Sequence, residues 1–115
     1  MQIIKDNLYQ VTYHIYFCSP EKMKKELHGH AIDEFDPDIC DGLHLHVSSK
    51  TETNVHIIWI NSMLPNKRKL TTLIHELSHA IITVWEVHGL NMTQDQEAYC
   101  YYFTYIFDQI KLGGK

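Results

Sequence analysis

Residues 70–85 read LTTLIHELSHAIITVW, and they combine the strongest structural pattern in the chain with a dense group of reactive side chains. The large apolar residues recur at intervals of three and four, which is the period of an amphipathic α-helix. The pattern runs from just after Pro65 to about His88, where Gly89 is suited to end a helix. We therefore expect one long helix here, with one side buried against the rest of the domain.

The segments before this helix predict strands. Residues 8–18, LYQVTYHIYFC, are rich in β-branched and aromatic side chains, and residues 43–48 alternate apolar and polar positions. Residues 55–60, VHIIWI, are apolar on both faces, so we expect them to form a central strand. A polar turn is expected at residues 49–54, between the last two strands.

Two further helices are predicted on either side of these elements. Ser19 can cap a short helix over residues 20–27, which begins with a proline. Thr93 and Gln96 have the spacing of a capping box, and apolar residues continue at helical spacing as far as Ile110. The chain therefore predicts an α+β fold, in which a small, mostly antiparallel sheet packs on the long helix and a second, C-terminal helix.

Length and composition limit the class of protein. The 115 residues fit one domain, residues 1–115, and 44% hydrophobic with 21% charged side chains excludes a disordered chain. The net charge of −4 disfavours a nucleic-acid binder, and no apolar run approaches the ~20 residues of a membrane span. Three cysteines without paired spacing, and no signal peptide in the first ten residues, predict a cytoplasmic protein. Nine histidines point instead to metal chemistry.

Within the long helix, His75, Glu76 and His79 form the pattern HExxH. Residues four apart lie about one turn apart on the same face, so both imidazoles can reach one ion. Zinc binds imidazole nitrogens, and a catalytic zinc keeps one of its tetrahedral positions for water. Glu76 stands next to the first ligand, where it can accept a proton. The pattern predicts a zinc site with Glu76 as general base; the alternative is a polar helix face that holds these residues by chance.

A third zinc ligand has to come from outside the motif, because catalytic zinc sites have three protein ligands. Glu86 and His88 lie about 10 Å or more beyond His79 along the same helix, which is too far. Glu97 follows a turn and lies early in the second helix, which makes it the main candidate. Asp95 is shorter and nearer the helix start, so it is a weaker candidate, and a residue elsewhere is the remaining alternative.

The sequence around the motif resembles a known family. Residues 72–81, TLIHELSHAI, look like the extended signature of zincin metallopeptidases, and the pair Glu97-Ala98 follows in the second helix. This arrangement is similar to that of the gluzincins, the thermolysin-like class. The small size resembles minimal gluzincins encoded by phages, prophages and archaea, or the repressor-cleaving metallopeptidases of mobile elements. The resemblance covers about residues 55–105.

The resemblance implies a zinc ion held by His75, His79 and Glu97. It also implies that Glu76 acts as the general base. Thermolysin-like enzymes carry an Asp four residues after the ligand Glu, which orients the first histidine. This chain has Tyr101 at that position, so it departs from the family in the residues that support the ligands.

Two groups outside the motif have alternative interpretations. Tyr101 lies one turn after Glu97 and could donate a hydrogen bond to the oxyanion of a tetrahedral intermediate; the alternative is a tyrosine cluster that packs against the long helix and the sheet. His44 and His46 share one strand face, and His56 lies on the next strand. These three could bind a second metal, although half-exposed polar positions of a strand are the simpler explanation.

These features predict a zinc-dependent peptidase that hydrolyses a peptide bond through a metal-activated water. Its partner would be a protein or peptide substrate, which could add to a sheet edge beside the cleft. No nucleic-acid or membrane partner is expected. The alternative is a non-catalytic, zinc-bound interaction module of a mobile element that binds a host protein. Replacement of Glu76 by Gln separates the two hypotheses, because it keeps the ligands and removes the base.

Overall fold

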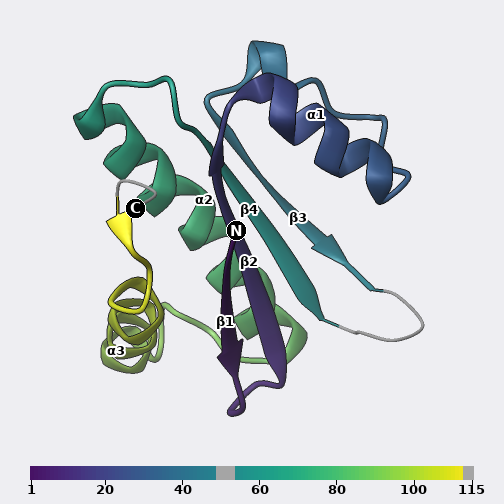
Figure 1. Cartoon of the computed structure of the whole chain (residues 1–115). Coiled ribbons are helices and arrows are strands. Elements are labelled where there is room, and N and C mark those ends of the chain that lie inside the picture. The colour runs from purple at the N-terminus through teal and green to yellow at the C-terminus, as the bar shows by residue number, and fades with distance from the viewer. Residues whose placement is uncertain (49–53, 113–115) are drawn as a thin grey trace.

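The computed structural model describes residues 1–48 and 54–112, so most of the turn expected at 49–54 lies outside the described residues. Four strands form one mixed sheet in the order β1-β2-β4-β3 (Figure 1). The strands are β1 (Gln2–Asp6), β2 (Val11–Cys18), β3 (Gly42–Val47) and β4 (Val55–Asn61). The structure confirms the expected α+β fold.

β4 is the central strand, as its apolar sequence predicted. It pairs in parallel with β2 and antiparallel with β3, and six of its seven residues are buried. Two of the three strand pairings are antiparallel, as expected. β1 was not predicted, because its five residues are too few for a clear pattern, and it pairs with β2 at the edge of the sheet.

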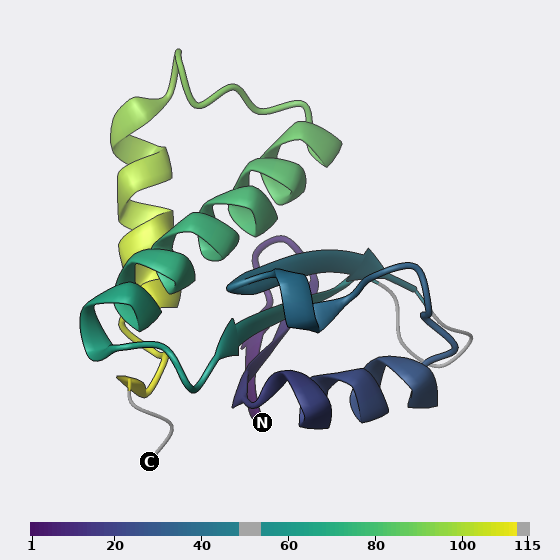
Figure 2. The ribbon, with the colours of Figure 1, turned by 90° about the horizontal axis from the view of Figure 1, so that it is seen from above.

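The helices lie on both faces of the sheet (Figure 2). One face carries α1 (Pro20–Gly29), and the other carries α2 (Asn66–Val87) and α3 (Gln96–Phe107). A short 3-10 helix, η1 (Pro37–Ile39), joins α1 to β3. Ser19 caps α1 as predicted, since its side chain accepts a hydrogen bond from the backbone N–H of Lys22. Gly89 follows α2 with a φ of 71°, the conformation expected after a helix end.

The predicted capping box at the start of α3 is wrong. The helix begins at Gln96, and Asp95 occupies its N-cap position without a side-chain hydrogen bond. Thr93 belongs to the preceding turn, where its backbone N–H donates to the side chain of Asn91. That bond stabilises the turn instead of the helix, and α3 therefore starts later than the sequence pattern indicated.

The long helix α2 is held against the sheet by its apolar side. Leu73, Leu77 and Ile81 are fully buried, and they belong to one core cluster with Ile58 and Ile60 of β4. A second cluster lies between the opposite face of the sheet and α1. None of the helices in the described part of the chain is both long enough and apolar enough to cross a membrane.

A buried network of hydroxyls joins α3 to the sheet. The Tyr102 hydroxyl donates to the carboxylate of Asp6 at 2.6 Å and lies 2.7 Å from the Tyr13 hydroxyl. Asp6 also accepts hydrogen bonds from the backbone N–H groups of Leu8 and Tyr9, in the turn between β1 and β2. Because all three side chains are buried, loss of one partner would leave the others unsatisfied.

We predict that Tyr102→Phe lowers the free energy of unfolding by about 1–3 kcal/mol, because it removes one buried hydrogen bond from Asp6 and one from Tyr13. Urea unfolding measures the change. The matched control is Tyr105→Phe on the same helix, where the side chain is exposed and the expected change is within ~0.5 kcal/mol. Equal stability of the Tyr102 variant and the wild type would contradict this role for the network.

Candidate metal centre

The three motif residues form a compact group on the surface of α2. The Nε2 atoms of His75 and His79 lie 3.2 Å apart, and a Glu76 oxygen lies 4.0 Å from the Nε2 atom of His75. One ligand atom from each residue lies within 4.8 Å of the other two. This is the single group of three or more His, Cys, Asp or Glu side chains with metal-site spacing among residues 1–48 and 54–112. The structure therefore brings together His75, Glu76 and His79, as predicted.

The separation of the two imidazoles fits a zinc ion. Two nitrogen atoms that each lie 2.0–2.1 Å from one tetrahedral ion are about 3.3 Å apart. The observed 3.2 Å agrees with this value. The His75 side chain is 67% exposed, and His79 is also exposed, so an ion and a further ligand can approach from solvent.

Glu76 differs from the two histidines because β3 packs against it. A Cβ atom added to Gly42 would lie 2.6 Å from the Thr72 side chain and 2.6 Å from the Trp59 carbonyl oxygen. It would also lie 3.3 Å from the Cγ atom of Glu76. Gly42, which was not among the predicted site residues, therefore allows β3 to approach α2 closely. A glycine directly before an alternating strand was the available signal.

This close approach leaves an open hollow at the start of β3. Its volume is about 390 Å³, and its lining includes His75 and Glu76. Asp41 and Gly42 of the β3 side complete it together with Thr71 and Thr72 of α2.

Burial raises the pKa of Glu76, and the neighbouring His75 and His79 lower it. Only 12% of the Glu76 side chain is exposed, in contrast to His75. A carboxylate whose pKa is raised accepts a proton more readily, which is the property required of a general base. The role of Glu76 as general base stays a prediction.

Three histidines of the sheet lie on the face that carries α2. His44 Nε2 and His56 Nδ1 are 2.8 Å apart, and the His46 ring stacks on His56 with centroids 4.3 Å apart. His56 is only 1% exposed, His44 is half-buried and His46 is exposed. Of the three histidines that were expected at half-exposed positions, only His44 is half-exposed. A distance of 2.8 Å fits a hydrogen bond between imidazoles and is shorter than the ~3.3 Å of two ligands of one zinc.

His44 connects this group to the motif. Burial, together with smaller contributions from nearby His79 and His46, lowers the pKa of His44 from 6.5 to about 4. Burial also lowers the pKa of His56, to about 3, with contributions from His44 and His46. Both imidazoles of the pair are therefore neutral at pH 7.

The structure does not bring Glu97 or Asp95 into the metal group. Glu97 is exposed at the start of α3 and lines a surface hollow with its neighbours in residues 93–98. Asp95 lies near Tyr9, a residue of the turn between β1 and β2. Burial raises the pKa of Tyr9 most, and the charges of Asp6 and Asp95 raise it further. The position of Glu97 as third ligand stays a prediction, and it requires the carboxylate to approach the imidazoles when a metal binds.

Helix α3 lies along a different flank of α2 from the one that faces β3. Tyr99 packs edge-on against Trp85, with ring centroids 5.6 Å apart, and it interacts with the Ser78 hydroxyl. His79, by contrast, lies on the flank that interacts with His44. Along α2, His79 is about 9 Å before Trp85, at 1.5 Å per residue.

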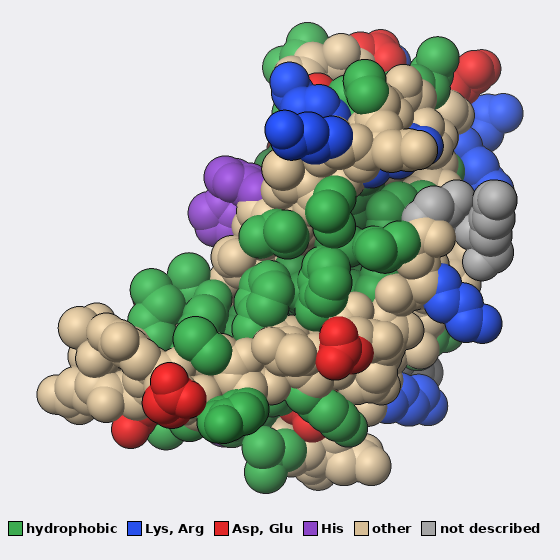
Figure 3. Space-filling view, turned by 90° about the vertical axis from the view of Figure 1, so that its left-hand side faces the viewer, with side chains coloured by type: hydrophobic (Ala, Val, Ile, Leu, Met, Phe, Trp, Pro, Cys, Tyr) green, Lys and Arg blue, Asp and Glu red, His purple; other side chains and the backbone are tan. Residues whose placement is uncertain are grey.

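The tyrosines of α3 divide into two sets. Tyr99 and Tyr102 pack against α2 and the sheet, as the packing alternative predicted. Tyr101 is 74% exposed, and within the described residues it makes no hydrogen bond or ring contact with the motif. Figure 3 shows hydrophobic side chains gathered on the face where α3 lies, and the exposed Tyr101 and Tyr105 belong to that helix.

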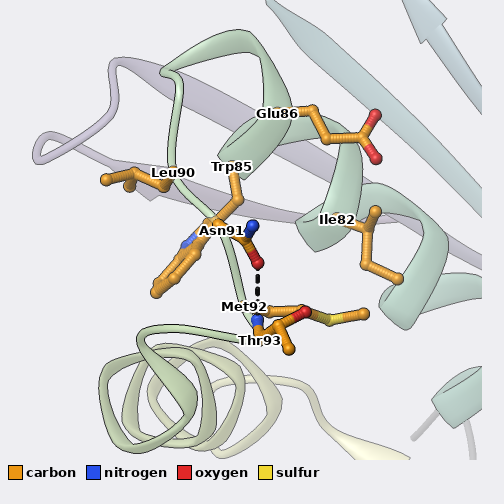
Figure 4. Close-up of a pocket in the computed structure, with 7 residues that line it drawn as sticks. All are labelled: Ile82, Trp85, Glu86, Leu90, Asn91, Met92 and Thr93. Atoms are coloured by element: carbon orange, nitrogen blue, oxygen red, sulfur yellow. Dashed lines mark hydrogen bonds between the residues drawn. The ribbon is translucent and has the colours of Figure 1, made fainter.

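A second hollow lies at the other end of α2 (Figure 4). Its volume is about 250 Å³, and Trp85, Glu86 and Thr93 are among its lining residues. Neither motif histidine lines it. Glu86 lies outside the metal group, as its distance along the helix predicted.

Comparison of the chain with protein-family models, curated proteins and solved structures finds no match. The resemblance to gluzincins thus rests on the motif residues themselves.

We predict that the metal-free protein loses stability as the pH falls from about 6.5 towards 4. His44 and His56 bind protons in the unfolded chain in this range, whereas their lowered pKa values keep them neutral in the fold. Each such histidine contributes a slope of up to about 1.4 kcal/mol per pH unit. Urea unfolding at several pH values should show a shallower loss for His56→Leu. The exposed control His30→Ala should match the wild type; identical slopes for all three proteins would contradict the prediction.

Proposed function

We propose that this protein is a zinc-dependent peptidase, in which the motif of α2 hydrolyses a peptide bond. The observation that carries the proposal is the 3.2 Å separation of the His75 and His79 Nε2 atoms, with the largely buried Glu76 side chain beside them. A zinc ion held there would polarise the carbonyl of a peptide bond and activate a water molecule. The donor set of two imidazoles suits zinc better than magnesium or calcium, which prefer oxygen ligands.

Glu76 and the two imidazoles would have different roles in this reaction. Glu76 is placed to accept a proton from the attacking water and to pass it to the leaving amine. Its burial against β3 supports this role, because it raises the pKa of the carboxylate. The exposed imidazoles would hold the metal beside the hollow that Glu76 lines, so a substrate would reach the site from the solvent side.

The free edge of β3 is the place where an extended substrate would bind. β3 is the last strand of the sheet, and it pairs with a neighbour on one side only. Its first residues border the hollow that contains Glu76. A peptide that added to this edge as a strand would run beside the motif, with backbone hydrogen bonds holding it.

Glu97 is proposed as the third ligand, and Tyr101 as a hydrogen-bond donor, on the basis of the family resemblance. Both residues lie on α3, four positions apart, so they share one face of that helix. A shift of the start of α3 towards the histidine flank of α2 would therefore move both side chains together.

The second candidate function is a non-catalytic, zinc-bound interaction module that binds a host protein. The observation that favours it is the exposed apolar surface over α3, where Tyr101 and Tyr105 face solvent (Figure 3). Such surfaces often mark protein-binding sites.

We predict about one equivalent of zinc per chain, measured by metal analysis of protein purified without a histidine tag. His75→Ala or His79→Ala should remove most of the zinc affinity, because only these imidazoles have the spacing of a zinc site. His44→Ala and His46→Ala should retain it. Less than about a tenth of an equivalent after zinc supplementation, or equal losses in all four variants, would reject this site.

We predict that Glu97→Ala weakens zinc binding by about 10-fold or more, whereas Asp95→Ala changes it little. The two residues lie two positions apart at the same exposed helix start, so they form a matched pair. Competition with a fluorescent zinc chelator measures both affinities. If the Glu97 and Asp95 variants bind zinc as tightly as the wild type does, the gluzincin ligand set is wrong.

We predict that Glu76→Gln keeps the bound zinc and lowers peptide hydrolysis by at least about 10²-fold, because the amide cannot accept the proton. A fixed library of synthetic decapeptides is incubated with each protein, and new N-termini are identified by mass spectrometry. Cleavage by the wild type and not by Glu76→Gln supports the peptidase. Equal cleavage patterns, or none from the zinc-loaded wild type, would favour the interaction module.

A further inference from the structure

His44 and His56 form a hydrogen-bonded imidazole pair beside the motif. Neither residue has a role in the peptidase mechanism proposed above. The two nitrogen atoms that face each other are 2.8 Å apart. One ring must therefore donate an N–H and the other must accept it, because both imidazoles are neutral in this contact. One N–H hydrogen of the pair therefore lies between the two rings. The other N–H group is on a ring nitrogen that does not face the partner ring.

The register between β3 and α2 places His44 next to His79. β3 is antiparallel to β4, and α2 returns along β4 after a short turn, so β3 and α2 run in the same direction. Gly42 meets Thr72 and Glu76, and His44 lies about 6.7 Å farther along the strand. This distance corresponds to about four to five helix residues, which leads from midway between Thr72 and Glu76 to about His79. The electrostatic interaction between His44 and His79 agrees with this alignment.

His56 cannot itself reach a substrate. It is 1% exposed on the central strand, it is stacked under His46 and its Nδ1 atom is engaged by His44. Its effect is on the orientation of His44. When His56 Nδ1–H donates to His44 Nε2, the neutral His44 ring carries its own hydrogen on Nδ1. That N–H is then available for a group outside the pair.

We propose that His44 is a catalytic residue that donates a hydrogen bond to the carbonyl oxygen of the bound peptide, and that His56 is the positioning residue that orients it. The inference rests on the proposed peptidase function. Negative charge grows on the carbonyl oxygen as water attacks the carbon, and a donor fixed in advance stabilises that charge. The proton stays on His44 throughout, and Glu76 performs the proton transfer.

The site geometry favours His44 over Tyr101 for this task. His44 is half-buried on the strand that borders the motif hollow, and a buried partner fixes its ring. Tyr101 is 74% exposed and has to move with α3 before it can reach the motif. A preformed donor requires no such rearrangement at the moment of reaction.

The test compares the zinc-loaded wild type with His44→Ala, His46→Ala and Tyr101→Phe on the library peptide that the wild type cleaves fastest. We expect His44→Ala to lower kcat about 10²–10³-fold, with KM changed less than ~3-fold. His46→Ala is the matched control from the same strand face, and it should stay within ~2-fold. Wild-type kcat in the His44 variant, or a loss in Tyr101→Phe alone, overturns the proposal and leaves the peptidase function intact. Absence of Glu76-dependent cleavage in the wild type instead refutes both.

A double-mutant cycle tests the positioning role. His56→Leu should lower kcat about 10-fold or more, and its addition to His44→Ala should cause no further loss, because His56 acts through His44. A merely structural role would lower the stability and activity of the double variant further. Additive losses in kcat therefore refute the positioning role.

A binding measurement gives a readout that is independent of turnover. Acetohydroxamate is titrated into the cobalt-substituted protein, and visible absorption reports its binding beside the metal. We expect its affinity to fall about 10-fold in His44→Ala and to remain unchanged in His46→Ala, because the hydroxamate oxygen loses a hydrogen bond. Equal affinity in the wild type and His44→Ala would overturn the donor assignment.

Discussion

The close contact of β3 with α2 at Gly42 is the constraint on which the candidate site depends. No side chain larger than hydrogen fits between the Trp59 carbonyl and Thr72 at this point. Glu76 is largely buried at this contact, whereas His75 and His79 are exposed to solvent. Burial disfavours the charged carboxylate and so makes it a better proton acceptor. One packing contact thus distinguishes the base from the ligands in a motif whose residues are adjacent in sequence.

The two flanks of α2 have different partners, and this separates metal chemistry from structural packing. The flank towards β3 carries the motif, the open sheet edge and His44. The other flank is covered by α3, where Tyr99 packs on Trp85. A third ligand from α3 must cross from one flank to the other. Metal binding and the position of α3 would then be coupled, since the binding free energy would have to offset the rearrangement.

The sheet beneath α2 contains polar groups that are satisfied in pairs. His56 bonds to His44, and the adjacent Tyr13 bonds to Tyr102, with the rings of His56 and Tyr13 5.7 Å apart. Buried polar groups are costly unless they are hydrogen-bonded, so each pair restricts how its elements can pack. The first pair fixes the edge strand beside the motif, and the second, through Asp6, fixes α3 against the opposite edge. The two pairs therefore fix elements at the two opposite edges of the sheet.

The sequence by itself determined the features that depend on local periodicity. The helix of α2, the central strand β4 and the shared helix face of His75 and His79 all follow from residue spacing, because a helix or strand fixes which side chains share a face. The capping box failed, because Asn91 offered the Thr93 backbone a competing hydrogen bond. Five residues were too few to predict β1.

Only the tertiary structure decided which elements meet. The parallel pairing of β2 with β4, the contact of Gly42 with α2 and the pairing of His44 with His56 join residues far apart in the chain. The packing of α3 on the flank of α2 away from His79 is also a contact between distant residues, and residue spacing along the chain did not determine it. Such contacts depend on how side-chain volumes fit together across the core, which local periodicity does not encode.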